Sequence, residues 1–253
     1  MKKIKEKINR ITIATTIILL AIKLFIIFAL PINVLAESIE YTQIKDIRLN
    51  DYFKINQDCS VKAFQGTENA QIEDSVPARL CFCKGKSDEC FEAKSFTSTG
   101  TRNFQFVKKL SITPLFKSKE PHNAVLFIAE NHTEGGSGYL RLITLWTYSI
   151  LDKKFVNLLP LIQITEQGEY RLLTAKEGIE GLFVTADYIW GENETHFSPH
   201  RYKINIYFFN DGKKSYNLRK EYITKSKYKS LDDVERINVI MPELNKIKEL
   251  LNK

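Results

Sequence analysis

Hydrophobic and polar residues alternate along several segments after residue 97, and alternation with a period of two predicts β-strands. Val125–Ala129 is instead apolar throughout, which is typical of a short buried strand. Turn-forming residues separate the segments, and Asn210-Asp211-Gly212 is a strong hairpin signal. The pattern therefore predicts a mainly β fold of antiparallel strands, which include Phe104–Ile112, Tyr139–Tyr148 and Tyr202–Phe209.

Part of this pattern occurs twice. Leu126–Glu130 recurs as Leu182–Asp187, and Lys153-Lys154-Phe155 is echoed by Lys213-Lys214-Ser215-Tyr216, about sixty residues later. An offset of that size suits a duplicated meander of three or four strands. Two copies are too few to close a propeller, so we expect an antiparallel sandwich or a compact barrel.

The duplication also predicts which residues lie inside the domain. If 126–165 and 182–224 are copies, Trp146 takes a place equivalent to Tyr207 or Phe208 and lies in the core. The loops before the two long strands should then emerge at the same edge, where loops on a rigid scaffold recognise partners. Ser137 and His200 would be exposed loop residues, and replacing either with Ala should cost no more than ~0.5 kcal/mol.

The two ends of the chain differ from this β pattern. Residues 1–36 join a basic start, a long apolar run and a small-residue site before Glu37, which predicts a cleaved secretory signal peptide. The apolar run is also long enough to be an uncleaved anchor, although Lys23 in its middle disfavours a stable span. No later segment is long and apolar enough to form a second span.

At the other end we expect one or two short helices. Ser230 precedes acidic residues, as at many helix starts, and the segment after Pro242 places Leu244, Ile247 and Leu251 on one face. The organisation predicted is a signal peptide at 1–36, a disulfide-containing β segment at 37–96, a duplicated meander at 97–229 and a helical segment at 230–253.

Removing the signal peptide changes the charge of the protein. The whole chain has 37 basic and 30 acidic residues, a net charge of +7, but six of the basic residues and one acid lie in 1–36. The mature chain keeps 31 basic and 29 acidic residues, a net charge of +2. A nucleic-acid partner would need clustered positive charge, so this composition argues against one.

Four cysteines lie in one short window. In an exported chain, Cys59, Cys81, Cys83 and Cys90 indicate two disulfides. A hairpin turning at 84–88 would place Cys90 opposite Cys83 and leave Cys59 for Cys81, although spacing alone leaves the other pairings open. A zinc site is the competing interpretation, but Cys-x-Cys lacks the usual knuckle spacing and no His lies nearby.

Histidine and carboxylate residues suggest a second kind of site. Glu130, His132, His196 and His200 fall in corresponding loops of the two copies, and together they could hold zinc or calcium. His-x3-His binds a metal best on a helix, however, and Pro199 makes a helix unfavourable there. A solvated loop is the alternative.

One stretch resembles a known family. Val125–Glu130, then Gly136-Ser137-Gly138-Tyr139, then a long alternating strand, resembles the periplasmic inhibitors of invertebrate-type lysozymes. Members of that family are small β-rich proteins that insert a Ser-Gly-x-x-Tyr loop into the lysozyme cleft. The resemblance assigns this role to Ser137 and Gly138, but Arg141 stands where the motif has Tyr, and Tyr139 precedes it.

These patterns lead to one functional hypothesis and one alternative. We expect a periplasmic or secreted, non-enzymatic β domain that binds a protein or small-molecule partner through Ser137, Gly138, Tyr139, His196 and His200, with lysozyme inhibition as one form of this. The alternative is a metal-dependent hydrolase that uses the His and Glu residues of the two equivalent loops.

Overall fold

The computed structural model of the chain describes residues 41–55, 58–66, 76–84, 87–97, 100–117, 121–132, 139–173, 177, 179, 181–195, 197–210, 213–229 and 237–252. The predicted signal peptide and the helix start predicted at Ser230 lie outside these residues. Ile39–Lys253 forms one compact unit. No helix among the described residues is long and apolar enough to cross a membrane.

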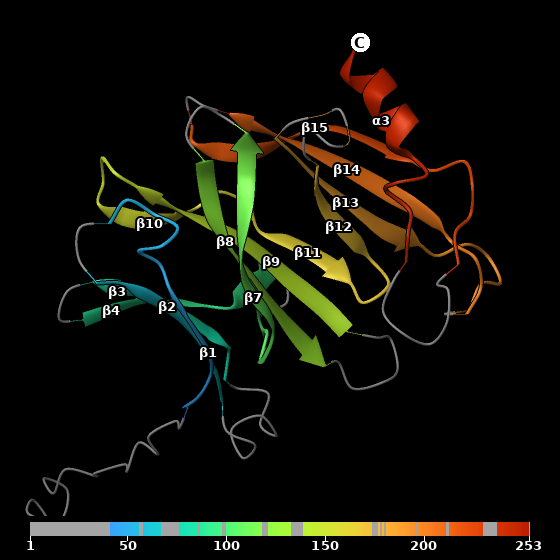
Figure 1. The fold of residues 1–253 in the computed structure, drawn as a ribbon. Helices are drawn as coiled ribbons and strands as arrows, with labels where there is room; N and C mark the ends of the chain where they lie inside the picture. The colour runs from blue at the N-terminus through green and yellow to red at the C-terminus, as the bar shows by residue number, and fades with distance from the viewer. Residues whose placement is uncertain are drawn as a thin grey trace, which may run out of the picture. The chain divides into compact units, whose positions relative to one another are not determined.

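Antiparallel strands make up most of the described chain, as predicted (Figure 1). The first sheet has the order β1 (Tyr41–Arg48), β2 (Ser60–Gly66), β3 (Arg79–Lys84), β4 (Ser87–Glu92). The second has the order β10 (Lys154–Asn157), β9 (Tyr139–Ser149), β8 (Pro121–His132), β7 (Phe106–Lys117), and β11 (Ile162–Thr165) also pairs with β9. The third has the order β12 (Glu169–Leu173), β13 (Leu182–Ile189), β14 (Arg201–Asn210), β15 (Ser215–Ile223). A small hairpin joins β5 (Lys94–Thr97) to β6 (Gly100–Asn103).

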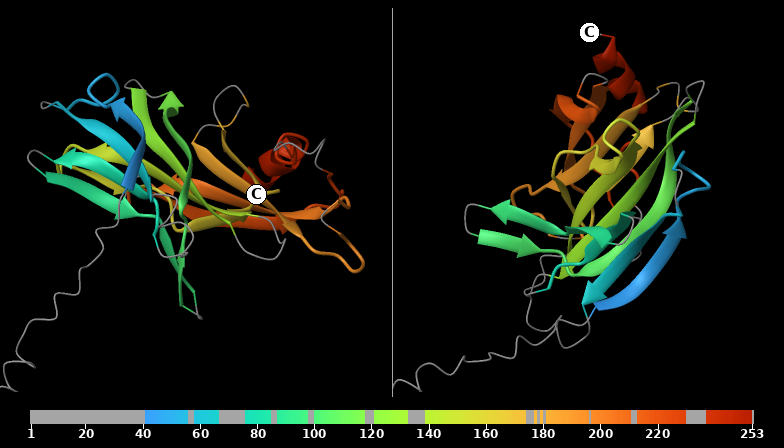
Figure 2. Two further views of the ribbon diagram at one scale, coloured as in Figure 1. Left: turned by 90° about the horizontal axis from the view of Figure 1, so that it is seen from below. Right: turned by 90° about the vertical axis from the view of Figure 1, so that its left-hand side faces the viewer.

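The sheets pack in layers, so the sandwich was the right expectation, and no closed barrel forms among the described strands. One core cluster lies between the first and second sheets and a second between the second and third sheets. The third cluster lies between the third sheet and the C-terminal segment. Helix α3 (Leu244–Leu251, red) accordingly lies beside the third sheet (orange) in Figures 1 and 2.

Strand β8 shows why an apolar run was the correct signal for a buried strand. Successive side chains of a strand point to opposite faces. Val125 and Phe127 therefore contribute to the cluster with the first sheet, whereas Leu126 and Ile128 contribute to the cluster with the third. Each such side chain stabilises the fold by about 1.5–3 kcal/mol when it is fully buried. Both faces of the central part of β8 are buried, so its sequence has no alternating polar residues.

The internal echo corresponds to equivalent hairpins. The β9–β10 turn runs from Ser149 to Lys154, and the β14–β15 turn runs from Asn210 to Ser215, each pair of residues being opposite in its ladder. The last turn residue is a left-handed lysine in both, Lys153 with φ 51° and Lys214 with φ 48°.

Equivalent side chains also face equivalent neighbours. Counted back from the turns, Trp146 and Tyr207 occupy the same position, and each faces the preceding sheet of the stack. Phe155 of β10 and Tyr216 of β15 do the same. The two meanders therefore repeat along the direction in which the sheets are stacked.

The C-terminal helix follows the predicted face. Ile247 is fully buried, and Leu244 and Leu251 pack beside it in the third cluster. Glu169 of β12 fixes the approach to this helix, because its Oε2 accepts hydrogen bonds from the backbone N–H groups of Val239 at 2.6 Å and Ile240 at 2.8 Å. Hydrogen bonds to a carboxylate are stronger than those between neutral groups, and these two anchor the segment before helix α3 to the third sheet.

The disulfides form in the predicted window, but their predicted connectivity is wrong. The bonds are Cys59–Cys83 and Cys81–Cys90, not Cys59–Cys81 and Cys83–Cys90. The hairpin is present, yet Lys84 pairs with Ser87, so its turn is shorter than predicted. That register places Cys81, not Cys83, opposite Cys90, and Cys83 is left to reach Cys59.

Candidate functional site

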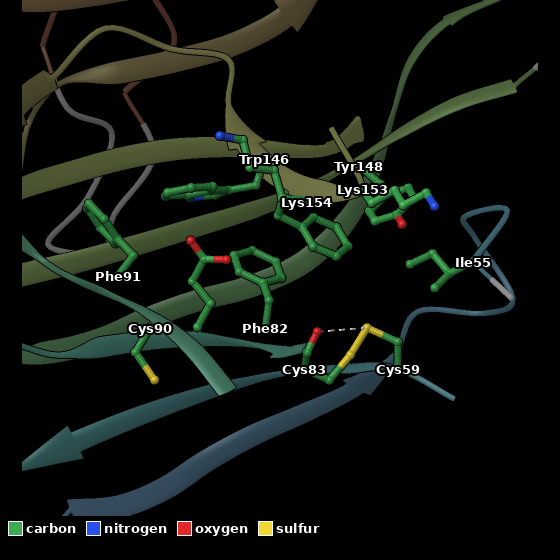
Figure 3. A pocket seen from close by; sticks show the side chains of 12 residues that line it. Ile55, Cys59, Phe82, Cys83, Cys90, Phe91, Trp146, Tyr148, Lys153 and Lys154 are labelled. Atoms are coloured by element: carbon green, nitrogen blue, oxygen red, sulfur yellow. Dashed lines mark hydrogen bonds between the residues drawn. A yellow bond between two sulfur atoms is a disulfide. The ribbon is translucent and has the colours of Figure 1, made fainter. Parts of the chain in front are cut away.

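A cavity of about 190 Å³ lies where the disulfide-bearing hairpin of the first sheet faces the β9–β10 hairpin of the second (Figure 3). Ile55 and Cys59, from the segment before β2, close one end. Cys59 and Cys83 both line the cavity, so their disulfide holds this wall, and Cys90 contributes to the lining from β4. The remaining lining residues are Phe82, Glu89, Phe91, Trp146, Tyr148, Lys153, Lys154 and Phe155.

Five aromatic rings line the cavity. Phe82 and Phe155 stack with centroids 4.2 Å apart, Phe91 lies 5.1 Å from Trp146, and Tyr148 lies 5.3 Å from Phe155. Such spacings stabilise aromatic pairs beyond the burial of their area. The indole Nε1 of Trp146 donates to Thr144 Oγ1 at 2.8 Å, so the only polar atom of this ring is satisfied within β9.

The registers of both hairpins explain why these rings meet. In the β3–β4 ladder, Cys81 lies opposite Cys90, and the adjacent positions Phe82 and Phe91 project from the other face of the sheet. In the β9–β10 ladder, Phe155 lies opposite Tyr148. The cluster between the first and second sheets contains Phe82, Phe91, Trp146 and Phe155.

At the equivalent position of the second copy, the described side chains pack closely. Tyr216, the counterpart of Phe155, is only 1% exposed and packs against Phe183 and Phe209. Its backbone N–H also donates to Leu158 O at 2.7 Å. The cavity in the first copy thus lies at a position that the same supersecondary unit fills elsewhere in this chain.

Three charged residues are also among the lining residues of the cavity. Lys153 and Lys154 come from the β9–β10 turn and the first residue of β10, and both are exposed. Glu89, from β4, is the acidic lining residue. An apolar floor with a few polar groups at its mouth is the usual construction of a ligand site. The arrangement can hold a flat apolar group and contact a polar substituent at the rim.

Glu130, predicted as a metal ligand, belongs to an ion pair instead. It is 5% exposed, and its Oε1 accepts from Arg141 Nε at 2.7 Å, while Lys108 Nζ lies 3.7 Å from its Oε2. Arg141 also donates to the backbone carbonyl of Glu166 at 3.1 Å. A buried carboxylate needs such partners, and these join three strands of the second sheet to the β11–β12 connection.

His200 was predicted as an exposed binding or metal-ligating residue, and its exposure was wrong. It is 1% exposed, and its backbone pairs with Tyr228 through hydrogen bonds of 2.8 and 2.7 Å. Its Nδ1 lies 2.7 Å from Glu194 Oε2, and the rings of Tyr188 and Trp190 pack against it. Its Nε2 is buried and has no hydrogen-bond partner among the described residues.

Glu194 is the centre of the contacts around His200. Lys227 Nζ lies 2.6 Å from its Oε1, and the backbone N–H of Gly191 donates to its Oε2 at 2.8 Å. Hydrogen bonds from Lys227, then His200 and Gly191, lower the pKa of Glu194 to about 2. These contacts fasten the loop between β13 and β14, which is a structural role.

The remaining predicted site residues are less informative. Ser137, Gly138 and His196 lie outside the described residues, as does the side chain of His132, whose backbone pairs with Tyr139 at the end of the β8–β9 ladder. Tyr139 is 37% exposed at the start of β9. Within the described part of the chain, no group of three or more His, Cys, Asp and Glu residues is arranged to hold a metal ion.

One feature of the sequence indicates which aromatic residues face the cavity. Phe82 and Phe91 each adjoin a cysteine, and a disulfide-bonded hairpin must place such neighbours on the face opposite the Cys81–Cys90 bond. The duplication predicts that Trp146 lies in the core, but it does not predict a cavity beside it. Which face of the hairpin opposes them depends on packing between sheets, which no local pattern reveals.

Comparisons of the chain with protein-family models, with curated protein sequences and with solved structures found no match.

Proposed function

We propose that the mature chain is an exported binding protein whose aromatic cavity receives one ring-sized apolar group of its ligand. The observation that carries this proposal is the cavity of about 190 Å³ walled by Phe82, Phe91, Trp146, Tyr148 and Phe155. A dry cavity of about 150 Å³ is enough to bind benzene, whereas sites for drug-sized ligands span about 300–1,000 Å³. The volume therefore favours a single ring or a branched aliphatic group.

Export is part of the same proposal. The pattern of residues 1–36 supports a secretory signal, and two disulfides are compatible with an oxidising extracellular or periplasmic compartment. Because the Cys59–Cys83 disulfide lies in the cavity wall, oxidation in that compartment would stabilise the site.

The chain supplies its own reporter for a binding test. It has two tryptophans, and Trp146 lines the cavity whereas Trp190 packs against His200. In the mature Trp190→Phe variant, emission excited at long wavelength comes from Trp146 alone. Titration with phenylacetamide, a neutral single-ring probe, should shift this emission saturably.

A filled cavity is the control. Ile55→Phe places extra volume at the lining and should abolish the shift, while Ile44→Phe, at an exposed position of β1, should not. Melts of both variants verify folding. If phenylacetamide leaves the Trp146 emission unchanged in protein with both disulfides intact, the cavity does not bind rings and the proposal fails.

Lysozyme inhibition remains a proposal for a protein partner of this chain. The observation that favours it is Tyr139, which is exposed beside the Ser137 and Gly138 positions that the resemblance singles out. The mature protein would then reduce the lytic activity of an invertebrate-type lysozyme. Full lysis at a large molar excess of the protein would exclude it.

A further inference from the structure

The positive charge of the mature chain is concentrated in one part of the third sheet. Residues 201–229 comprise β14, β15 and the segment after them, and they contain nine basic and two acidic residues, a net charge of +7. The rest of the mature chain keeps 22 basic and 27 acidic residues, a net charge of −5. The small net charge of the whole conceals this asymmetry, which is typical of a surface that meets an anionic partner.

These basic residues lie along one edge of the third sheet. β15 is the last strand of that sheet, and among the described strands it pairs with β14 alone (Figure 1). The chain stays beside the start of β14 after β15 ends, because the backbones of His200 and Tyr228 pair. The basic side chains of these segments form a basic edge. It consists of Arg201, Lys203, Arg219, Lys220, Lys225, Lys227 and Lys229, and all seven are exposed.

Few carboxylates offset the charge of the basic edge. Lys203 Nζ lies 2.9 Å from Glu221 Oε2, and Lys227 Nζ lies 2.6 Å from Glu194 Oε1. The carboxylate of Glu243 accepts hydrogen bonds from two tyrosine hydroxyl groups of the same segment. Seven basic residues and these three carboxylates leave a net charge of +4. The other five basic residues form no ion pair with any residue that the structure describes.

Protection of an edge strand does not by itself explain this composition. Charged side chains keep an exposed edge from pairing with another chain, and charges of either sign can serve that purpose. β1 is an edge strand of the first sheet, and it carries both signs in Lys45, Asp46 and Arg48. In contrast, residues 219–229 contain five basic residues and only one acid, Glu221. The single sign of the charge therefore indicates a partner of the opposite sign.

Exposed apolar side chains lie among these cations. Ile223 is 55% exposed and lies opposite Lys203, and Leu218 is 47% exposed and lies opposite Tyr207. Because Lys203 and Tyr207 are four residues apart in β14, Ile223 and Leu218 lie on the same face of the sheet. Trp190 follows β13 where β14 begins, and it is 49% exposed. The partner must therefore accept apolar groups as well as cations.

We propose that the basic edge binds the surface of a lipid bilayer that contains anionic phospholipids. The lipid phosphates attract the ammonium and guanidinium groups, and Ile223 and Leu218 enter the headgroup region. A nucleic acid offers phosphates but no apolar layer, so the exposed apolar side chains favour the bilayer. This inference goes beyond the aromatic cavity and is independent of it, because no lining residue of that cavity belongs to β14 or β15.

Cosedimentation with vesicles tests the proposal. The chain that begins at Glu37 contains the whole compact unit Ile39–Lys253 and lacks the apolar run of residues 11–30, which would bind lipid by itself. Vesicles of equimolar phosphatidylglycerol and phosphatidylcholine should sediment this protein at low salt, and vesicles of phosphatidylcholine alone should not. Equal sedimentation with the two kinds of vesicle, or none with either, overturns the proposal.

Removal of charge locates the binding surface. Each lysine or arginine near an anionic bilayer raises the partition coefficient about fivefold, so Arg219→Gln/Lys220→Gln should lower it about 25-fold. Lys45→Gln/Lys109→Gln removes the same charge from exposed positions of β1 and β7 and should leave the partition coefficient nearly unchanged. Thermal melts verify that both variants are folded. Equal losses in the two variants would mean that the overall charge attracts the protein and that the basic edge is not the site.

Loss of an apolar side chain separates a bilayer from a soluble polyanion. Ile223→Ser should weaken binding to the anionic vesicles about tenfold, the lower end of what burial of an isoleucine side chain contributes. Ile44→Ser, at an exposed position of β1, is the control and should not weaken it. A duplex oligonucleotide is the comparison ligand. If the protein binds the duplex more tightly than the anionic vesicles, and Ile223→Ser changes neither affinity, the basic edge binds nucleic acid and the lipid proposal is wrong.

Discussion

At the residue scale, several carboxylates and one imidazole that suggested a site in the sequence make contacts that hold strands and loops together. Glu130 and Asp187 are the last residues of the two echoed segments. Arg141 ties Glu130, and Thr165 ties Asp187, to a neighbouring strand. Burial raises the pKa of Asp187, and hydrogen bonds from Thr165 and Tyr188 oppose that shift. Carboxylates and imidazoles are conspicuous in a sequence, but only packing shows whether they face solvent or hold loops together.

His200 gives a direct test of this distinction. Replacing it with Ala removes a buried ring and its contact with Glu194, so we expect a loss of about 2–4 kcal/mol in the free energy of unfolding. That corresponds to a fall of roughly 5–15 °C in Tm for a chain of this size. Phe197→Ala, at a residue 79% exposed in the same loop, is the control and should change Tm little.

If the His200→Ala variant has the same Tm as the parent protein, His200 is exposed in solution. The original sequence expectation would then be correct, and His200 would again be available to a ligand. The same measurement therefore decides between the loop-exposed and the buried descriptions of this histidine.

At the element scale, local pattern predicted strands well and their partners poorly. The alternating segments correspond to β9 and β14, and the apolar run is the centre of β8. The predicted face of Leu244, Ile247 and Leu251 is the buried face of helix α3. The connectivity of the cysteines was missed because a shift of two residues in the β3–β4 register exchanges Cys81 and Cys83 without changing any alternation. The cavity was missed for a related reason, since its walls belong to two sheets.

The loop between β13 and β14 should respond to acid through Glu194. The pKa of this carboxyl is lowered from 4.5 to about 2, so the unfolded chain takes up the proton first as the pH falls. The stabilisation from Glu194 is therefore fully present above about pH 4.5 and is lost between that pH and about 2. The difference in Tm between the parent and Glu194→Gln should narrow across this window.

The control for this acid response lies in the same loop. Glu192→Gln removes an exposed carboxylate two residues away, so it changes the net charge equally. Melts of the three proteins at intervals from pH 6 to pH 2.5 make the comparison. If Glu194→Gln and Glu192→Gln differ from the parent in the same way at every pH, the contacts of Glu194 with Lys227 and His200 do not stabilise the fold.

At the scale of the whole molecule, the stacked layers share their strands. Phe127 and Leu126 are adjacent in β8 yet belong to the first and second clusters, and Phe183 and Leu182 are adjacent in β13 yet belong to the second and third. Each of these strands contributes one face to one cluster and its other face to the next. Exposing one cluster to water therefore displaces a strand that also packs in its neighbour. The described layers should therefore unfold together, although they contain several sheets.

The two tryptophans allow this cooperativity to be measured, because Trp146 reports on the first cluster and Trp190 packs against Tyr188, which adjoins the third. Single-tryptophan variants Trp190→Phe and Trp146→Phe should each give denaturation curves that coincide with their own far-ultraviolet circular dichroism. Phe127→Ala should destabilise the protein by about 3–5 kcal/mol through the first cluster. The transition seen by Trp190 should move by the same amount.

Transmission of the Phe127→Ala effect to Trp190 is the decisive result, because Phe127 has no part in the third cluster and can affect it only through shared strands. The matched variant Ile204→Ala removes a buried side chain from the third cluster and should shift the Trp146 transition in the same way. If each substitution moves only the transition of its nearer tryptophan, the sheets unfold as independent units. The cavity between the first two sheets could then open without unfolding the third.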